Sequence, residues 1–159
     1  ALEADHVPTL GQIAATLRQR GDFRRAAAHW QRVVELDPRN ADAFYNLGLV
    51  FRYDLQDPAT ALTFWRQAVA LDSTHWDARY NLALALYAAG ENAESLAHWL
   101  QAVAMRPDHP QGHNGLGTVY KALGRYREAA TAWQHAVRLA PDYAIAHFNL
   151  GLVFLHQLD

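Results

Sequence analysis

The stretch FYNLGLVF at residues 44–51 returns almost unchanged as FNLGLVF at residues 148–154. A phrase written twice in one chain is either a shared catalytic motif or a structural unit laid down repeatedly. An internal repeat determines the whole fold of a chain, and a constant spacing of similar residues reveals it.

Tryptophans give the clearest spacing. Four of them are separated by 35, 34 and 34 residues, and each follows a small residue one helical turn earlier. A leucine followed by glycine or alanine keeps the same period, at 47–48, 82–83, 116–117 and 150–151. Residues one helical turn apart form an apolar stripe on one side of a helix, and here this stripe recurs along the chain. The tryptophans are Trp30, Trp65, Trp99 and Trp133, and the small residues are Ala26, Ala61, Ser95 and Ala129.

Glycines and prolines separate the stripes. Glycine suits the left-handed backbone that closes many helices, and proline cannot continue a helix. In the second repeat, residues 53–59 carry one extra residue and no glycine. Asp57 before Pro58 is typical of a capped helix start. The glycines are Gly21, Gly90 and Gly124, and the prolines are Pro38, Pro107 and Pro141.

The pattern predicts an all-α chain of nine helices, which form four hairpins and the first helix of a fifth. No strand pattern competes with this assignment. The predicted helices are 8–20, 23–36, 41–53, 58–71, 75–88, 91–104, 109–122, 125–138 and 143–156.

A 34-residue helical hairpin with Leu-Gly in its first helix, an alanine and an aromatic one turn apart in its second, and a closing proline resembles the tetratricopeptide repeat. The resemblance covers residues 7–159 and implies one array over 1–159, a right-handed superhelical solenoid of stacked antiparallel helix hairpins with about four and a half repeats. We expect the four periodic tryptophans to be core residues and Trp76, outside the period, to lie at the surface. The predicted repeats are 7–40, 41–75, 76–109, 110–143 and a first helix at 144–159.

Composition excludes several classes of protein. The chain has 159 residues, of which 51% are hydrophobic and 19% charged, and this is typical of a folded protein. A net charge of −2 gives no field that would collect nucleic acid, and no cysteine is present for a disulfide or thiolate site. No apolar run is long enough for membrane insertion. We therefore expect a protein or peptide partner, with no nucleic acid and no membrane insertion. The arginine-rich, lysine-poor composition favours a bacterial source. The sequence leaves the compartment undetermined, with the cytoplasm favoured.

Catalytic and metal sites find little support. His109 and His113 have a spacing that could bind a metal on a helix, but Pro110 and Gly112 indicate a helix start and no third ligand accompanies them. The serines lie at a turn and a packing position, with no oriented base. We expect no enzyme activity, no metal and no cofactor.

The family resemblance implies that the first helices line a concave groove, which would bind a peptide segment or helix of a partner. Side chains that flank the Leu-Gly pairs would supply an asparagine row, an aromatic row, an aliphatic floor and some cations. The predicted groove residues are Gln12, Arg18, Tyr45, Asn46, Leu49, Arg52, Tyr80, Asn81, Leu84, Tyr87, Asn114, Lys121, Phe148 and Asn149.

Two interpretations of the asparagine row remain open. An asparagine amide can donate to and accept from a peptide backbone, and similar rows are a feature of the tetratricopeptide superhelix of O-linked N-acetylglucosamine transferases. Alternatively, the asparagines bridge adjacent helices. Gly115 interrupts the row, with Asn114 one place off. The carboxylate clamp that grips chaperone tails is not matched, since Gly11 and Ala15 occupy positions where it needs a lysine and an asparagine.

The last helix, within AIAHFNLGLVFLHQL at residues 144–158, carries an apolar stripe that no second helix covers. We expect truncation of a longer array, with end-to-end self-association as a consequence. The sequence thus predicts a non-catalytic protein–protein interaction scaffold. The alternatives are a substrate-recognition arm of a larger enzyme such as a glycosyltransferase, and a self-assembling scaffold.

Overall fold

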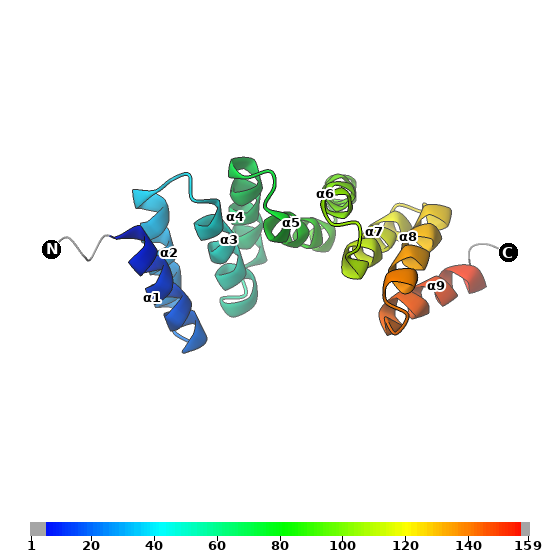
Figure 1. Cartoon of the computed structure of the whole chain (residues 1–159), viewed down its shortest axis with the longest axis horizontal. Coiled ribbons are helices and arrows are strands. Elements are labelled where there is room, and N and C mark those ends of the chain that lie inside the picture. The colour runs from blue at the N-terminus through cyan, green and yellow to red at the C-terminus, as the bar shows by residue number, and fades with distance from the viewer. Residues whose placement is uncertain (1–5, 157–159) are drawn as a thin grey trace. The chain divides into compact units, whose positions relative to one another are not determined.

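A computed structural model describes residues 6–156, which form α-helices and no strand within that range. The last three residues of the predicted fifth repeat, 157–159, lie outside the described residues. Figure 1 labels the helices in chain order. The chain divides into two compact units, one ending at Ala78 and the other beginning at Arg79.

Unit 1 consists of two helix hairpins. Helix α1 packs against α2, α2 against α3, and α3 against α4. The elements are α1 (Val7–Gln19), α2 (Phe23–Leu36), α3 (Ala41–Leu49), the π-helical turn η1 (Val50–Asp54) and α4 (Pro58–Leu71).

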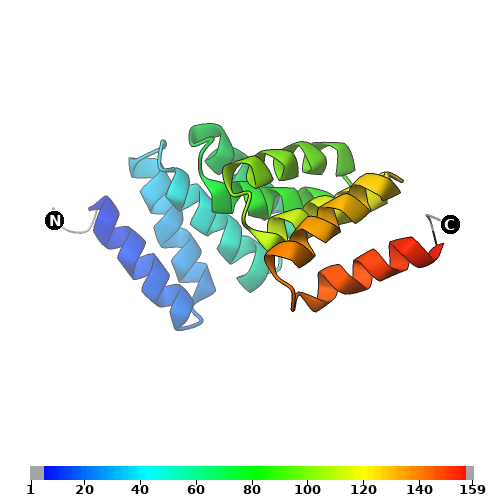
Figure 2. The same ribbon diagram turned by 45° about the vertical axis from the view of Figure 1, so that its right-hand side comes forward.

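Unit 2 continues the same alternation. Helix α7 packs against both α6 and α8, and α8 packs against α9 (Figure 2). Helix α5 begins three residues before the unit boundary. Every predicted helix boundary agrees with the structure to within one residue, apart from the division of the third helix into α3 and η1. The elements are α5 (Trp76–Ala88), α6 (Asn92–Met105), α7 (Pro110–Ala122), α8 (Tyr126–Leu139) and α9 (Ala144–His156).

The extra residue of the second repeat is absorbed by η1. In this turn the Leu55 backbone N–H donates to the Val50 carbonyl at 2.9 Å, five residues back, as in a π-helix. The chain then reverses at Gln56, whose φ of +58° lies in the left-handed region. Glycine occupies that conformation at the ends of three other first helices, where φ is 72° to 81°. Gln56 therefore takes the backbone conformation of those glycines, in a turn where the Asp57 N–H donates to the Phe51 carbonyl, six residues back, instead of five residues back as in the other three.

Polar side chains cap α2, α3 and α4 of unit 1. Asn40 accepts a hydrogen bond from the Ala43 N–H at 2.9 Å, and Asp57 accepts one from the Thr60 N–H at 3.1 Å. Pro58 follows as the first residue of α4, where its missing N–H costs nothing. These caps satisfy backbone donors that have no partner inside the helix.

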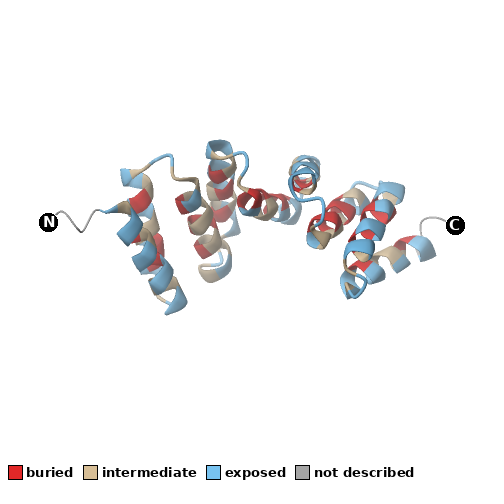
Figure 3. Ribbon diagram, in the orientation of Figure 1, coloured by how far each residue is buried: buried red, intermediate tan, exposed pale blue. Residues whose placement is uncertain are grey.

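Three of the four periodic tryptophans are core residues, as predicted: Trp65, Trp99 and Trp133 are at most 1% exposed. Trp30 is only half-buried. Buried positions recur along the helices of both units (Figure 3). Ser95 occupies the packing position that alanine takes in the other repeats. It is buried there, and its hydroxyl donates to the Ala83 carbonyl at 2.7 Å.

The expectation that Trp76 lies at the surface was wrong. Its side chain is buried, with 7% of its surface exposed. Position outside the tryptophan period predicted exposure, but a large apolar side chain at a helix start can be buried wherever another element packs over it.

Candidate functional site

The predicted groove residues lie on the first helix of each hairpin, α1, α3 with η1, α5, α7 and α9, and we call the surface they share within each unit the first-helix surface. None of these side chains is buried. The most exposed is Phe148, at 66%, and Leu84 and Tyr87 are exposed by 37% and 39%. The first-helix surface is therefore accessible in both units.

In unit 1 this surface contains a pocket of about 290 Å³, which we call the Arg18 pocket. Arg18 Nε donates to Asp54 Oδ2 at 2.5 Å, so its charge is paired. The attraction expected from Arg18 toward acidic ligands is accordingly reduced. Sequence reasoning missed Asp54, although the extra residue in its repeat was the signal that backbone geometry changes there. The lining residues are Ala15, Arg18, Gln19, Trp30, Asn46 and Asp54.

Two predicted residues of α3 are already engaged locally. Asn46 Nδ2 donates to the Asp42 carbonyl of its own helix at 2.7 Å. The Tyr45 ring packs on His75, with centroids 4.8 Å apart. Burial, and next the nearby carboxylate of Asp77, raise the pKa of the Tyr45 phenol above its usual value, so it is neutral at pH 7.

In unit 2 the first-helix surface contains a pocket of about 340 Å³, which we call the Lys121 pocket. Three successive first helices contribute to it: Tyr87 comes from α5, Lys121 from α7 and Asn149 from α9. No carboxylate within residues 6–156 forms an ion pair with Lys121. The pocket thus combines an unpaired ammonium group with phenol and amide groups. The lining residues are Tyr87, Thr118, Lys121, Ala122, Tyr126, Trp133 and Asn149.

A buried donor also faces this region. Trp133 Nε1 has no hydrogen-bond acceptor in the described part of the chain. In unit 1 the equivalent Trp65 Nε1 donates to the Tyr45 carbonyl at 3.2 Å. The corresponding carbonyl in α7, that of Asn114, instead accepts a hydrogen bond from Thr118 Oγ1 at 2.9 Å.

The break in the asparagine row has a steric cause. A Cβ added to Gly115 would overlap the six-membered ring of Trp99, so only glycine fits there. The amide appears one residue earlier, where Asn149 Nδ2 donates to Asn114 Oδ1 at 3.4 Å between α9 and α7. In this pair the asparagines bridge adjacent helices, with a long hydrogen bond.

The other predicted residues lie outside both pockets. Tyr80 packs edge-on against Trp99 with centroids 5.0 Å apart, and the Arg52 guanidinium lies 5.8 Å from the centre of the Tyr53 ring. Part of the aromatic row therefore also serves packing. Gln12 lines a separate pocket of about 390 Å³ on α1, with Thr9, Ile13, Thr16, Leu17 and Arg20. The predicted residues that line neither the Arg18 pocket nor the Lys121 pocket are Gln12, Tyr45, Leu49, Arg52, Tyr80, Asn81, Leu84, Asn114 and Phe148.

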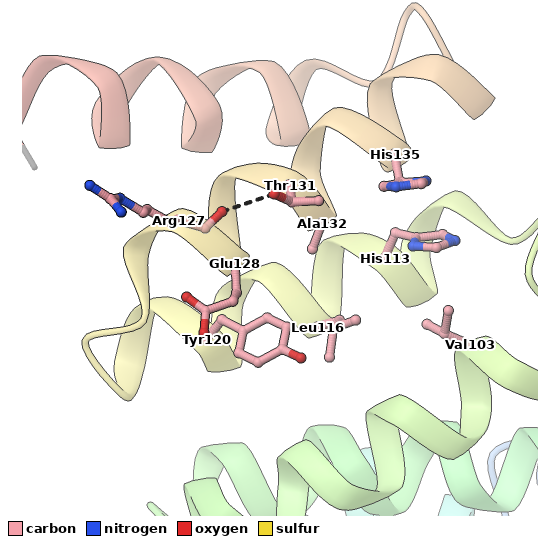
Figure 4. A pocket seen from close by; sticks show the side chains of 9 residues that line it. All are labelled: Val103, His113, Leu116, Tyr120, Arg127, Glu128, Thr131, Ala132 and His135. Carbon is pink, nitrogen blue, oxygen red and sulfur yellow. Dashed lines mark hydrogen bonds between the residues drawn. The ribbon is translucent and has the colours of Figure 1, made fainter. Parts of the chain in front are cut away.

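A further pocket, of about 380 Å³, involves α6, α7 and α8 and contains none of the predicted residues (Figure 4). His113 Nε2 donates to the Pro107 carbonyl at 2.8 Å, and its ring stacks on His135 with centroids 5.3 Å apart. Burial, and next the positive charge of Arg138, lower the pKa of His135. The lining residues are Val103, His113, Leu116, Tyr120, Arg127, Glu128, Thr131, Ala132 and His135.

Within residues 6–156, no group of three or more metal-ligating side chains converges. His113 stacks on His135 of another helix, and the number of residues between them matches no known metal-binding motif. Over the same residues, the helices lack the combination of length and apolarity needed to cross a bilayer.

Comparisons with known proteins agree with this architecture. A family model described as TPR repeat matches residues 15–51, 84–124 and 117–157, and a tetratricopeptide repeat model matches residues 42–74. No curated protein matches the chain.

Several solved structures are similar. A MamA protein is 25% identical with a TM-score of 0.88, covering 94% of this chain and 81% of that chain. MamA from Desulfovibrio magneticus RS-1 is 21% identical with a TM-score of 0.89, covering 96% of this chain and 86% of that one. YrrB, described as a TPR protein with an unusual peptide-binding site, is 21% identical with a TM-score of 0.65, covering 91% and 92%. The last two similarities, at this identity, concern the fold.

Proposed function

Because the chain belongs to the tetratricopeptide repeat family, we propose that the first-helix surface of each unit binds an extended peptide segment of a partner protein, at the Arg18 pocket in unit 1 and at the Lys121 pocket in unit 2. The repeats make the chain a protein-interaction scaffold. The observation that carries the finer proposal is the Lys121 pocket, where three successive first helices present accessible polar and aromatic groups around an unpaired cation.

The chemistry of the Lys121 pocket selects an acidic segment. An ammonium group attracts a side-chain or terminal carboxylate, and Tyr87 and Tyr126 offer apolar ring surface with a polar tip. The Asn149 amide can donate to a peptide carbonyl if its long bond to Asn114 is exchanged. A peptide with a carboxylate next to an aliphatic or aromatic side chain would use all of these groups.

The Arg18 pocket has a different preference. Because Asp54 already pairs with Arg18, an incoming carboxylate would have to displace an existing carboxylate. Asn46 keeps its side-chain oxygen as an acceptor and one N–H as a donor, since only one of its two amide hydrogens is used in the bond to the Asp42 carbonyl. This pocket therefore suits a neutral stretch of peptide backbone. The description of YrrB as a peptide-binding TPR protein supports such a use of the fold.

The test is a selection of peptides from a displayed random library, followed by titration of the selected peptides. We expect acidic peptides whose affinity falls at least about tenfold for Lys121→Ala, since a charge-assisted contact contributes roughly 1.5–3 kcal/mol. Gln134→Ala, an exposed change on α8 that lines none of the pockets described above, is the control. Peptides bound equally by the Lys121→Ala variant would reject this site.

Asn81 separates the two interpretations of the asparagine row. If Asn81 contacts a peptide backbone, Asn81→Ala should weaken binding by about 1–2 kcal/mol and leave the melting temperature unchanged. If Asn81 bridges helices, the melting temperature should fall while affinity for the selected peptide is retained.

A second candidate function is self-association through α9. Its outer side exposes Ile145 at 58%, Phe148 at 66% and Leu155 at 68%. Neighbouring large apolar side chains left in water favour association with another apolar surface.

A further inference from the structure

The pocket of about 380 Å³ that involves α6, α7 and α8, which we call the His113 pocket, lies apart from the peptide site proposed above. Its residues on α7 are His113, Leu116 and Tyr120, which recur at helical spacing along one side of the helix. Thr118 and Lys121, which line the Lys121 pocket, lie on a different side of the same helix. A ligand of one pocket therefore does not occupy the other.

The His113 pocket has an apolar floor and a polar end. Leu116 and Ala132 are buried and lie in its middle, and Val103 of α6 completes the apolar lining (Figure 4). The stacked rings of His113 and His135 form one end of the pocket. Binding sites for small molecules are typically mostly apolar clefts of about 300–1,000 Å³ with a few polar groups, and this pocket has both properties.

The hydrogen bonds of the two imidazoles determine which ring nitrogens remain available. His113 Nε2 donates to the Pro107 carbonyl at 2.8 Å, so Nδ1 carries no proton in the neutral ring. An arginine can only donate, so His135 Nδ1 accepts from Arg138 Nη2 at 2.9 Å and the proton of the neutral ring is on Nε2. Within residues 6–156, no other hydrogen bond reaches either ring. His135 Nε2 is therefore an available donor.

Elsewhere in the chain, histidines lie next to carboxylates. His75 Nε2 is 3.3 Å from Asp42 Oδ1, and His98 Nε2 is 3.8 Å from Glu94 Oε1. In the described part of the chain, neither ring of the stacked pair in the His113 pocket forms an ion pair with a carboxylate. The charged group that contacts this pair is instead the guanidinium of Arg138, which has no ion pair among the same residues.

The other charged groups of the pocket leave an excess of positive charge. Glu128 accepts from Arg125 Nε at 2.9 Å, and the Arg125 guanidinium lies 4.6 Å from the centre of the Tyr120 ring. Arg127 also lines the pocket and forms no ion pair over the described range 6–156. Together with Arg138, three guanidinium groups accompany one carboxylate. An anion complements this arrangement.

We propose that the His113 pocket binds a small organic carboxylate, whose carboxylate group lies at the two histidines and whose apolar body lies on Leu116 and Ala132. The carboxylate accepts a hydrogen bond from His135 Nε2 and supplies the negative charge that the histidine pair and Arg138 lack. The apolar body covers the floor of the pocket. The site takes a small molecule and not a peptide, so it goes beyond the function proposed above.

Binding at this site should strengthen as pH falls from about 8 to about 6. In the free protein, partial burial and then the neighbouring Arg138 and His113 lower the pKa of His135, so its ring is neutral at pH 7. A bound carboxylate favours the protonated ring, and binding is therefore coupled to proton uptake. Carboxyl groups remain ionised down to about pH 5, so the ligand keeps its charge over this range. The titratable or charged groups around the histidine pair are Tyr120, Arg127, Glu128 and Arg138, and α6 contributes the uncharged Val103.

The probe is phenylacetate, and its uncharged analogue phenylacetamide is the control ligand. Two-dimensional NMR spectra of the whole chain would follow both titrations at the ring signals of His113 and His135. We expect saturable shifts of these signals with phenylacetate. Affinity for phenylacetamide should be at least about tenfold lower, because the charge-assisted hydrogen bond is lost. Phenylacetate should also bind several-fold more tightly at about pH 6 than at about pH 8.

Matched variants locate the binding site. His135→Gln, at an exposed position, should weaken phenylacetate binding about tenfold. His29→Gln is the control, because His29 lies on a second helix of unit 1 and bonds to the Arg25 carbonyl of its own helix. Lys121→Ala should leave phenylacetate binding unchanged, although it removes the cation of the peptide site. Circular dichroism would show that each variant is folded.

Several results would overturn the proposal. These are no saturable binding of phenylacetate to the wild-type chain, equal affinity for phenylacetamide, and equal affinity at the two pH values. A loss with Lys121→Ala but not with His135→Gln would place the carboxylate in the Lys121 pocket and would also overturn it. Acidic peptides that lose affinity with His135→Gln and are displaced by phenylacetate would mean that a peptide, and not a small molecule, fills the pocket. Peptides that bind equally to the Lys121→Ala variant would reject only the peptide site.

Discussion

At the glycines of the first helices, the effect on stability depends on what occupies the space beside the missing side chain. Gly48, Gly117 and Gly151 each follow the periodic leucine of a first helix, but their surroundings differ. Gly48 and Gly117 face the indoles of Trp65 and Trp133, whereas Gly151 faces open space. In helices, glycine is otherwise unfavourable by about 1 kcal/mol relative to alanine.

Alanine substitutions at Gly117 and Gly151 should therefore change the free energy of unfolding in opposite directions. Gly117→Ala would bring a Cβ within 2.7 Å of Trp133 Nε1 and should lower the free energy of unfolding by about 1–3 kcal/mol. Gly151→Ala should raise it by about 0.5–1 kcal/mol, since nothing obstructs the added methyl group. Urea denaturation measures both changes. Equal effects of the two substitutions would contradict the difference in packing.

Gln56 bears a local strain that glycine would relieve. A side chain in the left-handed region costs about 1–2 kcal/mol, offset in part by the greater flexibility of glycine in the unfolded chain. Gln56→Gly should raise the free energy of unfolding by about 0.5–1 kcal/mol in a denaturation experiment. The matched change Gly90→Gln, at a φ of +81°, should lower it.

Asp57 should make stability depend on pH. Hydrogen bonds from the Thr60 hydroxyl and backbone N–H lower the pKa of its carboxyl below the unfolded value of 3.8. The stabilisation is present above that value and is lost as pH falls through the lower folded-state pKa. Thermal melts should show Asp57→Ala less stable than wild type at pH 7, with a smaller difference near pH 2. A constant difference across this range would argue against the cap.

At the scale of helices, stability depends on how completely each hairpin encloses its tryptophan. Trp99 is 1% exposed and lies between Tyr80 and the position of Gly115, whereas Trp30 is half-buried. In repeat proteins each hairpin is stabilised by its neighbours, so a loss at an inner hairpin also affects the next.

Trp99→Ala should consequently lower the free energy of unfolding by about 3–5 kcal/mol, and Trp30→Ala by clearly less. Guanidinium denaturation followed by circular dichroism would measure the difference. Equal losses would indicate that hairpin position does not matter.

For the whole molecule, the exposed side chains of α9 predict association that grows with concentration. Phe148 and Leu155 are exposed by 66% and 68%. Light scattering should show an increasing average mass, and the double change Phe148→Gln and Leu155→Gln should reduce it. A wild-type chain that stays monomeric at high concentration would reject this function.

The sequence by itself determined the helices, their boundaries and the tryptophan core. These follow from short-range rules: a stripe every three to four residues predicts a helix, and glycine and proline end it. The 34-residue period then identified the family, because a signal repeated four times along the chain needs no knowledge of long-range contacts.

Only the tertiary structure decided which surface groups are paired and which are free. Asp54 forms an ion pair with Arg18, the Trp99 ring requires glycine at 115, and Trp76 is buried. The spacing of residues along the sequence predicts none of these contacts. Each depends on the rotation of one helix against another, so a change of a few ångströms alters the partner. The same reason explains how the sequence NLGLVF, which occurs at residues 46–51 and 149–154, has its glycine against Trp65 in the first copy and in open space in the second: burial is decided by the neighbouring helix.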